Sequence, residues 1–260
     1  MTNPNPLANT FDLTGKVALV TGSSRGIGEA IARLLAAHGA HVIISSRKAE
    51  PCEAVAASIR EAGGKASVLA CHIGEVEQIG ATFAAIEQQF GRLDILVNNA
   101  ATNPYFGHIT DTDLGAFQKT VDVNIRGYFF MCARGAKMMA KQGGGSIINI
   151  ASVNGVIPGM AQGIYSITKA AVISMTHAFA KECATQKVRV NAILPGFTDT
   201  KFASALTSND MIMKTVLAHV PMDRVAEPSE MAGAALYLAS DAASYTTGTC
   251  LNVDGGYLLA

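Results

Sequence analysis

Short apolar runs alternate with longer amphipathic segments along most of this chain. The short runs are rich in Val and Ile without polar alternation, which is typical of strands buried on both faces of a parallel sheet. The longer segments repeat apolar residues three and four positions apart, which is typical of helices that cover a sheet. The expected strands are 16–20, 41–45, 66–71, 93–98, 146–151, 188–194 and 249–253, and the expected helices are 27–38, 49–62, 76–90, 114–141, 162–186 and 229–239.

This order of elements predicts an α/β fold, a doubly wound Rossmann-type domain with a mainly seven-stranded parallel sheet flanked by helices. Residues 1–10 are rich in Asn and Pro and are expected to form a flexible arm. No linker, repeat or low-complexity stretch divides residues 11–260, which are expected to form a single domain. In such folds ligands bind at the carboxyl ends of the strands.

Composition removes several classes of function. The 260 residues are 49% hydrophobic, which excludes extended disorder, and their formal net charge of zero argues against a nucleic-acid partner. No apolar run is long enough to span a bilayer, and the N-terminus lacks the features of a secretory signal. The five Cys form no CxxC pair and the six His are scattered, so we expect reduced thiols, no metal site and a cytoplasmic location.

A glycine-rich segment, TGSSRGIG at 21–28, follows the first expected strand and opens the first expected helix. Gly22 permits a tight turn, Gly26 lets the backbone approach a pyrophosphate, and Gly28 allows close packing of helix on sheet. The helix N-terminus then presents free N–H groups to the anion. An ordinary glycine-rich turn is the alternative, but the strand before and the helix after favour a dinucleotide site.

A second constellation consists of Ser152, Tyr165 and Lys169. Ser152 ends an expected strand, and Tyr165 and Lys169 are four residues apart, so they share one face of a helix. A lysine ammonium beside a tyrosine lowers the pKa of the phenol, and a serine hydroxyl can hold a substrate oxygen. The combination suits proton transfer to or from an alcohol or carbonyl oxygen.

Together these motifs resemble the short-chain dehydrogenase/reductase family. The resemblance covers nearly the whole chain, and the pieces occur in the family's order. They are TGSSRGIG (21–28), NNAA (98–101), Asn124 in VDVNIRG, Ser152, YSITK (165–169), LPGFTDT (194–200) and VDGG (253–256).

The resemblance implies a catalytic set and a cofactor set. Tyr165 would be the general acid/base, Lys169 would lower its pKa and bind the nicotinamide ribose, and Ser152 would hold the reacting oxygen. Asn124 would hold a water that links Lys169 to solvent, and Asn98 would brace the central strands. The implied cofactor-binding residues are Gly22, Ser24, Arg25, Gly26, Ile27, Gly28, Ser46, Arg47, His72, Ile73, Asn98, Ala100, Tyr165, Lys169, Pro195, Gly196, Thr198 and Thr200.

Two positions depart from the family pattern. Ala101 stands where relatives carry Gly, and His72 stands where many carry an Asp that contacts the adenine amino group. A neutral imidazole can accept one hydrogen bond, so His72 is either an adenine contact or a plain loop residue. The segments 45–48, 71–74 and 98–107 resemble the branch of NADP-dependent carbonyl and retinal reductases.

The cofactor expected is NADP(H) rather than NAD(H). NAD enzymes of this fold usually carry an acidic residue on the ribose 2′-hydroxyl, and Ser46 stands at that place. Arg47 follows directly and Arg25 lies in the glycine loop, so two cations are available for a 2′-phosphate. Solvated surface arginines are the alternative.

The expected function is hydride transfer between NADP(H) and a small-molecule carbonyl/secondary alcohol pair. One alternative is an NAD(H)-dependent alcohol dehydrogenase or 3-oxoacyl-type reductase. Another is an epimerase, lyase or dehalogenase on the same fold, and a third is a catalytically silent nucleotide-binding regulator. The resemblance implies a homotetramer built partly from residues 114–141 and 162–186, and a substrate loop at about 198–220. The expected substrate-binding residues are Ser152, Asn154, Tyr105 and Phe197, with Phe106, Ile157 and Met160 as further candidates.

Overall fold

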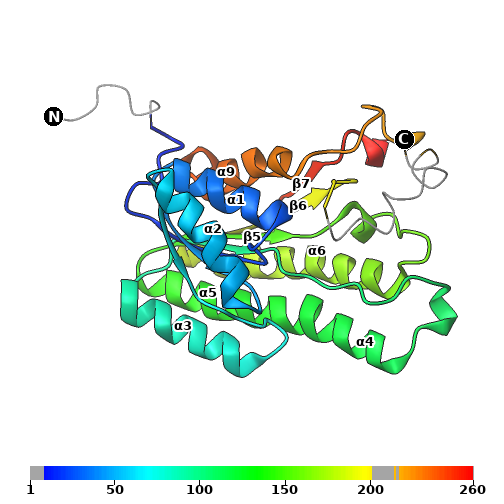
Figure 1. The fold of residues 1–260 in the computed structure, drawn as a ribbon, viewed down its shortest axis with the longest axis horizontal. Helices are drawn as coiled ribbons and strands as arrows, with labels where there is room; N and C mark the ends of the chain where they lie inside the picture. The colour runs from blue at the N-terminus through cyan, green and yellow to red at the C-terminus, as the bar shows by residue number, and fades with distance from the viewer. Residues whose placement is uncertain (1–8, 201–213, 215–216, 260) are drawn as a thin grey trace.

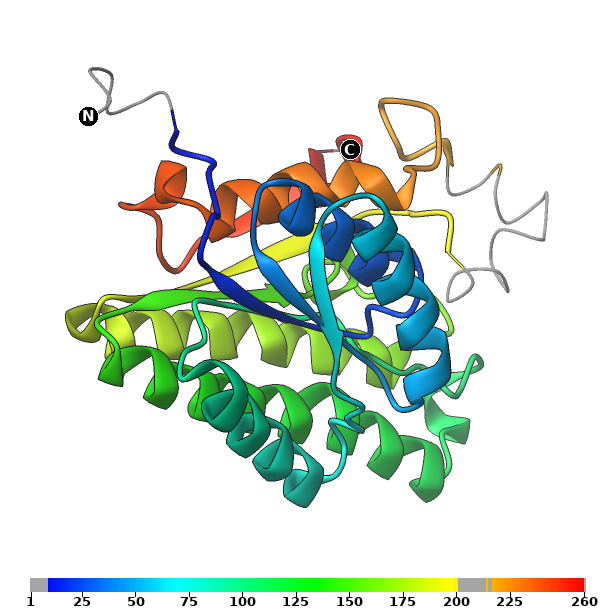
Figure 2. The ribbon, with the colours of Figure 1, turned by 60° about the vertical axis from the view of Figure 1, so that its left-hand side comes forward.

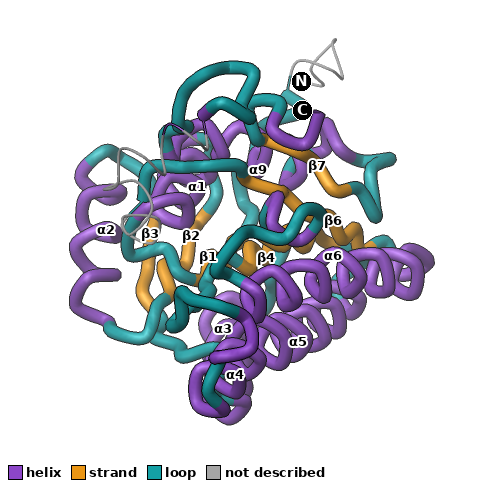
Figure 3. The backbone as a smooth tube through the Cα atoms, turned by 90° about the vertical axis from the view of Figure 1, so that its right-hand side faces the viewer, coloured by secondary structure: helices purple, strands orange, loops and turns teal. Residues whose placement is uncertain are grey.

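The computed structural model describes residues 9–200, 214 and 217–259. Its described strands form one parallel sheet of seven, in the order β3-β2-β1-β4-β5-β6-β7, and Figure 3 shows β3 and β7 at opposite edges. The predicted doubly wound fold is therefore confirmed. The strands are β1 Val17–Thr21, β2 His41–Ser45, β3 Lys65–Val68, β4 Ile95–Asn98, β5 Gly145–Ile150, β6 Val188–Pro195 and β7 Cys250–Val253.

Helices cover both faces of this sheet (Figures 1 and 2). One layer holds α1, α2 and α9, and the other holds α3, α5 and α6 with α4 at its end. No described helix is both long and apolar enough to cross a membrane. The helices are α1 Gly26–Ala37, α2 Ala49–Glu61, α3 Val76–Phe90, α4 Leu114–Val121, α5 Tyr128–Lys141, α6 Gly163–Cys183 and α9 Ala232–Ala239.

The two faces of β1 show why its sequence lacks polar alternation. Ala18 and Val20 pack into the core under α1, whereas Val17 and Leu19 pack into the core under α3 and α5. Successive side chains of a strand point to opposite faces, so a strand covered on both sides needs apolar residues throughout. All four side chains are buried, as the apolar run predicts.

The expected helix over 114–141 is broken in the structure. A π-helical segment, Asp122–Gly127, joins α4 to α5. Gly127 lies against the carbonyl oxygen of Ile73, where any Cβ would clash. The π turn also leaves Asn124 fully buried beside the site. Helical periodicity does not reveal such an insertion, because apolar spacing is similar on either side of it.

The expected arm, residues 1–10, falls mostly outside the described residues. Of its last two residues, Thr10 is tied to the domain, because its carbonyl accepts a hydrogen bond from the amide of Ala242 (3.2 Å). The boundary between arm and domain stays a prediction.

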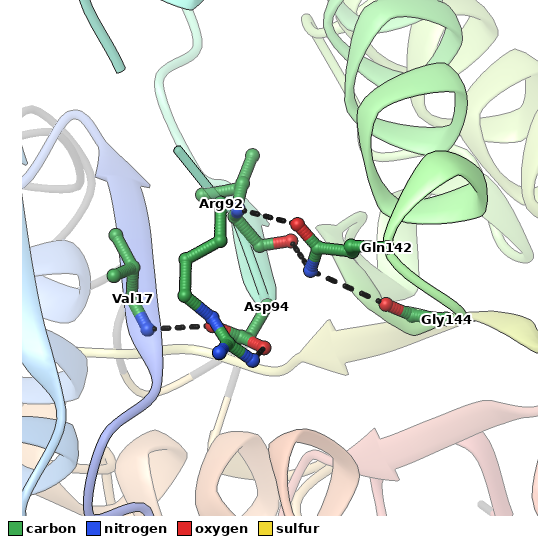
Figure 4. Close-up of polar contacts among 6 residues, drawn as sticks. Val17, Arg92, Asp94, Gln142 and Gly144 are labelled. Carbon is green, nitrogen blue, oxygen red and sulfur yellow. Dashed lines mark hydrogen bonds and ion pairs between the residues drawn. The ribbon is translucent and has the colours of Figure 1, made fainter. Parts of the chain in front are cut away.

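Polar contacts join the amino ends of the central strands β1 and β4, at the end of the sheet opposite the expected site (Figure 4). The buried carboxylate of Asp94 accepts from the amide of Val17 (2.9 Å) and from two nitrogens of Arg92 (2.9 and 2.6 Å). Gln142 accepts from the amide of Leu93 (3.0 Å) and donates to its carbonyl (2.8 Å). These contacts fix where β1 and β4 begin relative to the end of α5.

Asp94→Ala should therefore lower the free energy of unfolding by about 2 kcal/mol, because it leaves the amide of Val17 without its acceptor. Urea denaturation followed by circular dichroism measures the change. Asp111→Ala, at an exposed position, is the matched control and should change stability by less than about 0.5 kcal/mol. Equal stability of the two variants would show that the Asp94 contacts contribute little.

Candidate active site

A cavity of about 550 Å³ opens at the carboxyl ends of the strands, where the sequence predicts the site. Segments that follow six of the seven strands contribute to its wall. Nearly all the residues expected to bind cofactor or substrate line it, although they come from distant parts of the chain. Those are Gly22, Ser24, Arg25, Gly26, Ile27, Ser46, Arg47, His72, Ile73, Ala100, Phe106, Ser152, Asn154, Tyr165, Lys169, Pro195, Gly196, Phe197, Thr198 and Thr200.

Several expected residues do not line the cavity. Ile157 and Met160 are exposed and do not line it, and most of the expected substrate loop at 198–220 lies outside the described residues. Tyr105 is directed elsewhere, because its hydroxyl donates to the carbonyl of His108 (3.0 Å) and its ring end lies against Gly107. The structure thus does not bring Tyr105 to the expected substrate site, although its neighbour Phe106 is there.

The glycine loop has the close packing that its sequence predicts. Gly22 and Gly26 have φ values of +65° and +61°, which favour glycine. A Cβ at Gly28 would lie 2.5 Å from Asn99 Nδ2 and 2.6 Å from the carbonyl oxygen of Gly22, so only glycine fits beneath the loop. Gly28 therefore supports the loop without lining the cavity.

Asn98 and Asn124 lie behind the cavity wall as buried braces. Asn98 Nδ2 donates to Asn149 Oδ1 (2.9 Å), which links β4 to β5 as the resemblance implies. Asn124 Oδ1 accepts from the amide of Thr102 (2.9 Å), and its Nδ2 donates to Thr102 O (2.9 Å) and Thr168 Oγ1 (3.1 Å). Asn124 thereby joins the loop after β4 to α6, and its implied hold on a water stays a prediction.

His72 has one ring nitrogen already engaged. Nδ1 lies 3.0 Å from the amide nitrogen of Gly74 and accepts its hydrogen. A neutral imidazole in that arrangement carries its proton on Nε2, which then donates and does not accept. His72 therefore does not replace the implied Asp as an acceptor for the adenine amino group, although Nε2–H suits a ring nitrogen.

Three polar side chains form the expected catalytic cluster. Ser152 follows β5 and caps the short helix Val153–Gly155, where its Oγ accepts from the amide of Asn154 (3.1 Å). Tyr165 and Lys169 lie on successive turns of α6, and a hydrogen bond joins Tyr165 to Ser152. The side chain of Lys169 is 1% exposed, and its Nζ donates to the carbonyl of Ile150 (2.7 Å).

Burial governs the protonation of this cluster. It raises the pKa of Tyr165 well above its ordinary value, although the hydrogen bond with Ser152 opposes the shift. It also lowers the pKa of Lys169 to about 7. The sequence-based expectation that the Lys169 ammonium lowers the pKa of Tyr165 stays a prediction. Nζ lies 5.5 Å from the centroid of the Tyr165 ring.

This shift makes stability depend on pH in a defined direction. Because the pKa of Lys169 falls from 10.5 to about 7 on folding, the folded protein binds fewer protons than the unfolded chain between those values. Stability should therefore rise with pH across that window. Relative to Lys169→Met, the wild type should gain about 2 kcal/mol of unfolding free energy from pH 6.5 to 8.5.

Urea denaturation of both proteins at several pH values measures that difference. Taking the difference removes the contribution of cysteines and tyrosines, which both proteins share. Lys181→Met, at an exposed position on the same helix, is the control for the loss of a positive charge. Parallel pH profiles for the wild type and Lys169→Met would mean that Lys169 stays charged when buried.

The sequence reasoning missed several residues of the cavity wall, among them Asn99, Thr102 and Gln162. Asn99 Nδ2 donates to the carbonyls of Thr21 (3.0 Å) and Gly22 (3.1 Å), and so holds the glycine loop against the end of β4. Its place beside Asn98 in the NNAA motif was a usable signal. Gln162 precedes Tyr165 by three residues, which is helical spacing, and that signal was also present.

Known proteins resemble this chain over almost its whole length. A family profile described as enoyl-(acyl carrier protein) reductase matches residues 22–258. Dehydrogenase/reductase SDR family member 4 of Oryctolagus cuniculus is 37% identical over 256 residues, 98% of this chain and 96% of that protein. The 3-oxoacyl-(acyl-carrier-protein) reductase of Synechocystis sp. is 38% identical over 254 residues, 95% of this chain and 98% of that protein.

A solved structure is also similar to this chain over almost its whole length. The gluconate 5-dehydrogenase of Burkholderia cenocepacia, in complex with NADP and tartrate, superposes with a TM-score of 0.94 at 32% identity, covering 97% of this chain and 98% of that one. The chain belongs to the short-chain dehydrogenase/reductase family. It is an oxidoreductase that acts on CH–OH/C=O groups of small molecules with a nicotinamide cofactor.

Proposed function

We propose that this protein transfers hydride between NADP(H) and a carbonyl/secondary alcohol substrate, with Tyr165 as general acid/base. One observation carries the proposal: Ser152, Tyr165 and Lys169 line the same cavity as the glycine loop. The cofactor's phosphates and its reacting ring can therefore be held in one continuous space with the groups that move the proton. The branch of NADP-dependent carbonyl reductases, which the sequence resembles, remains part of this proposal.

The residues of the cavity fit a dinucleotide. Gly22 and Gly26 leave the backbone open toward the N-terminus of α1, where an anion is stabilised. Pro195, Gly196, Thr198 and Thr200 line the same cavity, with Thr200 beside Gly26, and they would frame the nicotinamide carboxamide and the phosphates. When bound, the nicotinamide supplies or accepts the hydride.

The chain's own residues manage the proton. Tyr165 is a neutral phenol at pH 7, because burial raises its pKa, so it is ready to donate a proton to a carbonyl oxygen that gains hydride. Ser152 is positioned to donate a hydrogen bond to the same oxygen. Lys169 would bind the ribose hydroxyls, and its ammonium form would stabilise the tyrosinate left after proton transfer.

The cavity also suits a 2′-phosphate. Ser46 and Arg47 follow β2, Arg25 lies in the glycine loop, and all three line the cavity. Within the described residues, neither arginine is in an ion pair with a carboxylate. Both guanidinium groups are therefore available to a phosphate, which they bind with matched planar geometry.

Steady-state assays test the function directly. The purified protein should oxidise NADPH in the presence of ketones or aldehydes, followed at the absorbance band of the reduced nicotinamide. Substrate-dependent oxidation faster with NADH would favour an NAD(H)-dependent alcohol dehydrogenase, and a preference for 3-oxoacyl thioesters would favour a 3-oxoacyl reductase. Tight NADPH binding without oxidation by any carbonyl compound would favour a silent nucleotide-binding regulator.

We also propose a homotetramer. Large apolar side chains on the outer face of α4, α5 and α6 are exposed, with Leu114 at 79%, Phe117 at 45%, Phe129 at 47% and Ile167 at 55%. Apolar patches on neighbouring helices mark interfaces in soluble proteins. Sedimentation at micromolar concentration should give a tetramer. A monomer under those conditions would refute this proposal.

A cytoplasmic location completes the proposal. All five cysteines are free thiols in the structure, and three of them are buried, which fits a reducing compartment. Cell fractionation followed by detection of the protein checks this location.

A further inference from the structure

Two side-chain carboxamides lie at the catalytic end of the cavity. Asn154 follows Ser152 by two residues, and its backbone amide donates to Ser152 Oγ (3.1 Å). Gln162 precedes Tyr165 by three residues and directly precedes α6. Each segment that carries a catalytic hydroxyl therefore also carries a carboxamide, and all four side chains line the same cavity.

The two carboxamides are close neighbours across the turn between Gly155 and Gly163. A Cβ placed on Gly159 would lie 2.8 Å from Asn154 Nδ2 and 3.0 Å from Gln162 Nε2. Both amide nitrogens thus lie within 3.0 Å of a single point, although the two residues are eight positions apart in the chain. Asn154 and Gln162 form one polar surface, called here the carboxamide pair.

The carboxamide pair makes few hydrogen bonds to the protein. Both residues are only 8% exposed. Within the described residues, the side-chain amide of Asn154 makes no hydrogen bond, and that of Gln162 has one long contact from Asn103 Nδ2 (3.4 Å). A carboxamide offers two donors and an acceptor with two lone pairs. Because buried polar groups are normally hydrogen-bonded, this capacity is available to a molecule in the cavity.

The wall of this cavity is also partly apolar, since Phe106, Val153 and Phe197 line it together with the carboxamide pair. A mixed wall of this kind binds a small molecule through apolar contact and orients it through a few polar groups. A neutral carboxamide both donates and accepts hydrogen bonds, as a hydroxyl group does. It is therefore a better binding partner for a hydroxyl group of a ligand than for a charged group or a hydrocarbon group.

We propose that the carboxamide pair selects substrates with a hydroxyl group on the carbon beside the reacting carbonyl. The proposal rests on the oxidoreductase function proposed above and names its substrate class: α-hydroxy ketones and the corresponding vicinal diols. Ser152 and Tyr165 hold the reacting oxygen, and Asn154 and Gln162 hold the neighbouring hydroxyl. A site built to hydrogen-bond a hydroxyl rejects an analogue that lacks it, because its own buried groups are left unpaired.

A pair of isosteric ketones tests the selection. Hydroxyacetone and butanone have the same number of heavy atoms and differ by a hydroxyl in place of a methyl group. With saturating NADPH, kcat/KM for hydroxyacetone should exceed that for butanone by about tenfold or more. In Gln162→Met and Asn154→Leu this ratio should fall about tenfold, and because it is a ratio it does not depend on the folded fraction of a variant.

Gln88→Met, at an exposed position on α3, is the matched control and should leave the ratio unchanged. A wild-type ratio of one or less would overturn the proposal. So would a ratio that is the same in the wild type and in both variants of the carboxamide pair.

Equilibrium binding separates this proposal from the proposed function. In Tyr165→Phe with bound NADP⁺, calorimetry measures the dissociation constants of 1,2-propanediol and 2-butanol without any turnover. The diol should bind about tenfold tighter, and adding Gln162→Met should remove that advantage. Equal binding of diol and alcohol overturns the selection by the carboxamide pair. Failure of the wild type to reduce any ketone, with selective diol binding intact, overturns the catalytic proposal alone.

Discussion

Tyr165→Phe is expected to reduce kcat/KM for carbonyl reduction by roughly 10²- to 10⁴-fold while NADPH binding persists. The ring of Tyr165 is 8% exposed and packs at the cavity wall, so phenylalanine keeps its packing and removes only the hydroxyl. No other described hydroxyl on α6 lines the cavity to take over the proton. Assays with a ketone and NADPH measure the loss, and NADPH fluorescence measures binding.

Tyr237→Phe is the matched control for this change. Tyr237 lies on α9, away from the cavity, where its hydroxyl bonds to Thr246 Oγ1 (2.9 Å). This variant should keep near-normal turnover. Near-normal turnover of Tyr165→Phe would instead remove Tyr165 from the proposed mechanism.

Simultaneous replacement of Arg25 and Arg47 by alanine should reverse or abolish the preference for NADPH over NADH. A hydrogen bond to a charged group is worth about 1.5–3 kcal/mol, so each lost guanidinium contact should lower kcat/KM for NADPH roughly 10- to 150-fold. NADH has no 2′-phosphate, so its kcat/KM should change little. Kinetics with both cofactors on one carbonyl substrate measure the two effects.

The single variants show how the phosphate is shared. If Arg47→Ala leaves the preference intact, Arg25 alone can hold the phosphate, and the double variant settles the point. Arg134→Ala, at an exposed position on α5 outside the cavity, is the matched control. A wild-type kcat/KM higher for NADH than for NADPH would overturn the cofactor assignment.

Most element positions were predictable because each depends on local chemistry. The expected strand 41–45 and helix 76–90 have the same bounds in the structure. The expected strand 66–71 is shorter in the structure, Lys65–Val68, although backbone hydrogen bonds from Leu69 N to Ile44 O (3.2 Å) and from Cys71 N to Ser46 O (2.9 Å) continue beyond it. The π-helical segment was not predictable, because it depends on the approach of Gly127 to the carbonyl of Ile73 from another part of the chain.

The candidate site likewise has features that the sequence predicts and features that it does not. The glycine loop and the shared helix face of Tyr165 and Lys169 were predictable from the sequence, because a turn and a helix face depend on residues that are close together in the chain. The direction of the Tyr105 side chain and the hydrogen bond to Nδ1 of His72 were not predictable. Each depends on which backbone group a short loop places beside the side chain.

By itself, the sequence determined the alternation of strands and helices, the dinucleotide loop and the identity of the groups able to move a proton. These follow from side-chain period, backbone freedom and functional-group chemistry, all of which act over a few residues. Only the tertiary structure decided the lowered pKa of Lys169 and the meeting of Asn154 with Gln162. Burial and contact between β5, α6 and the loops are properties of packing, because they depend on what surrounds a residue in space.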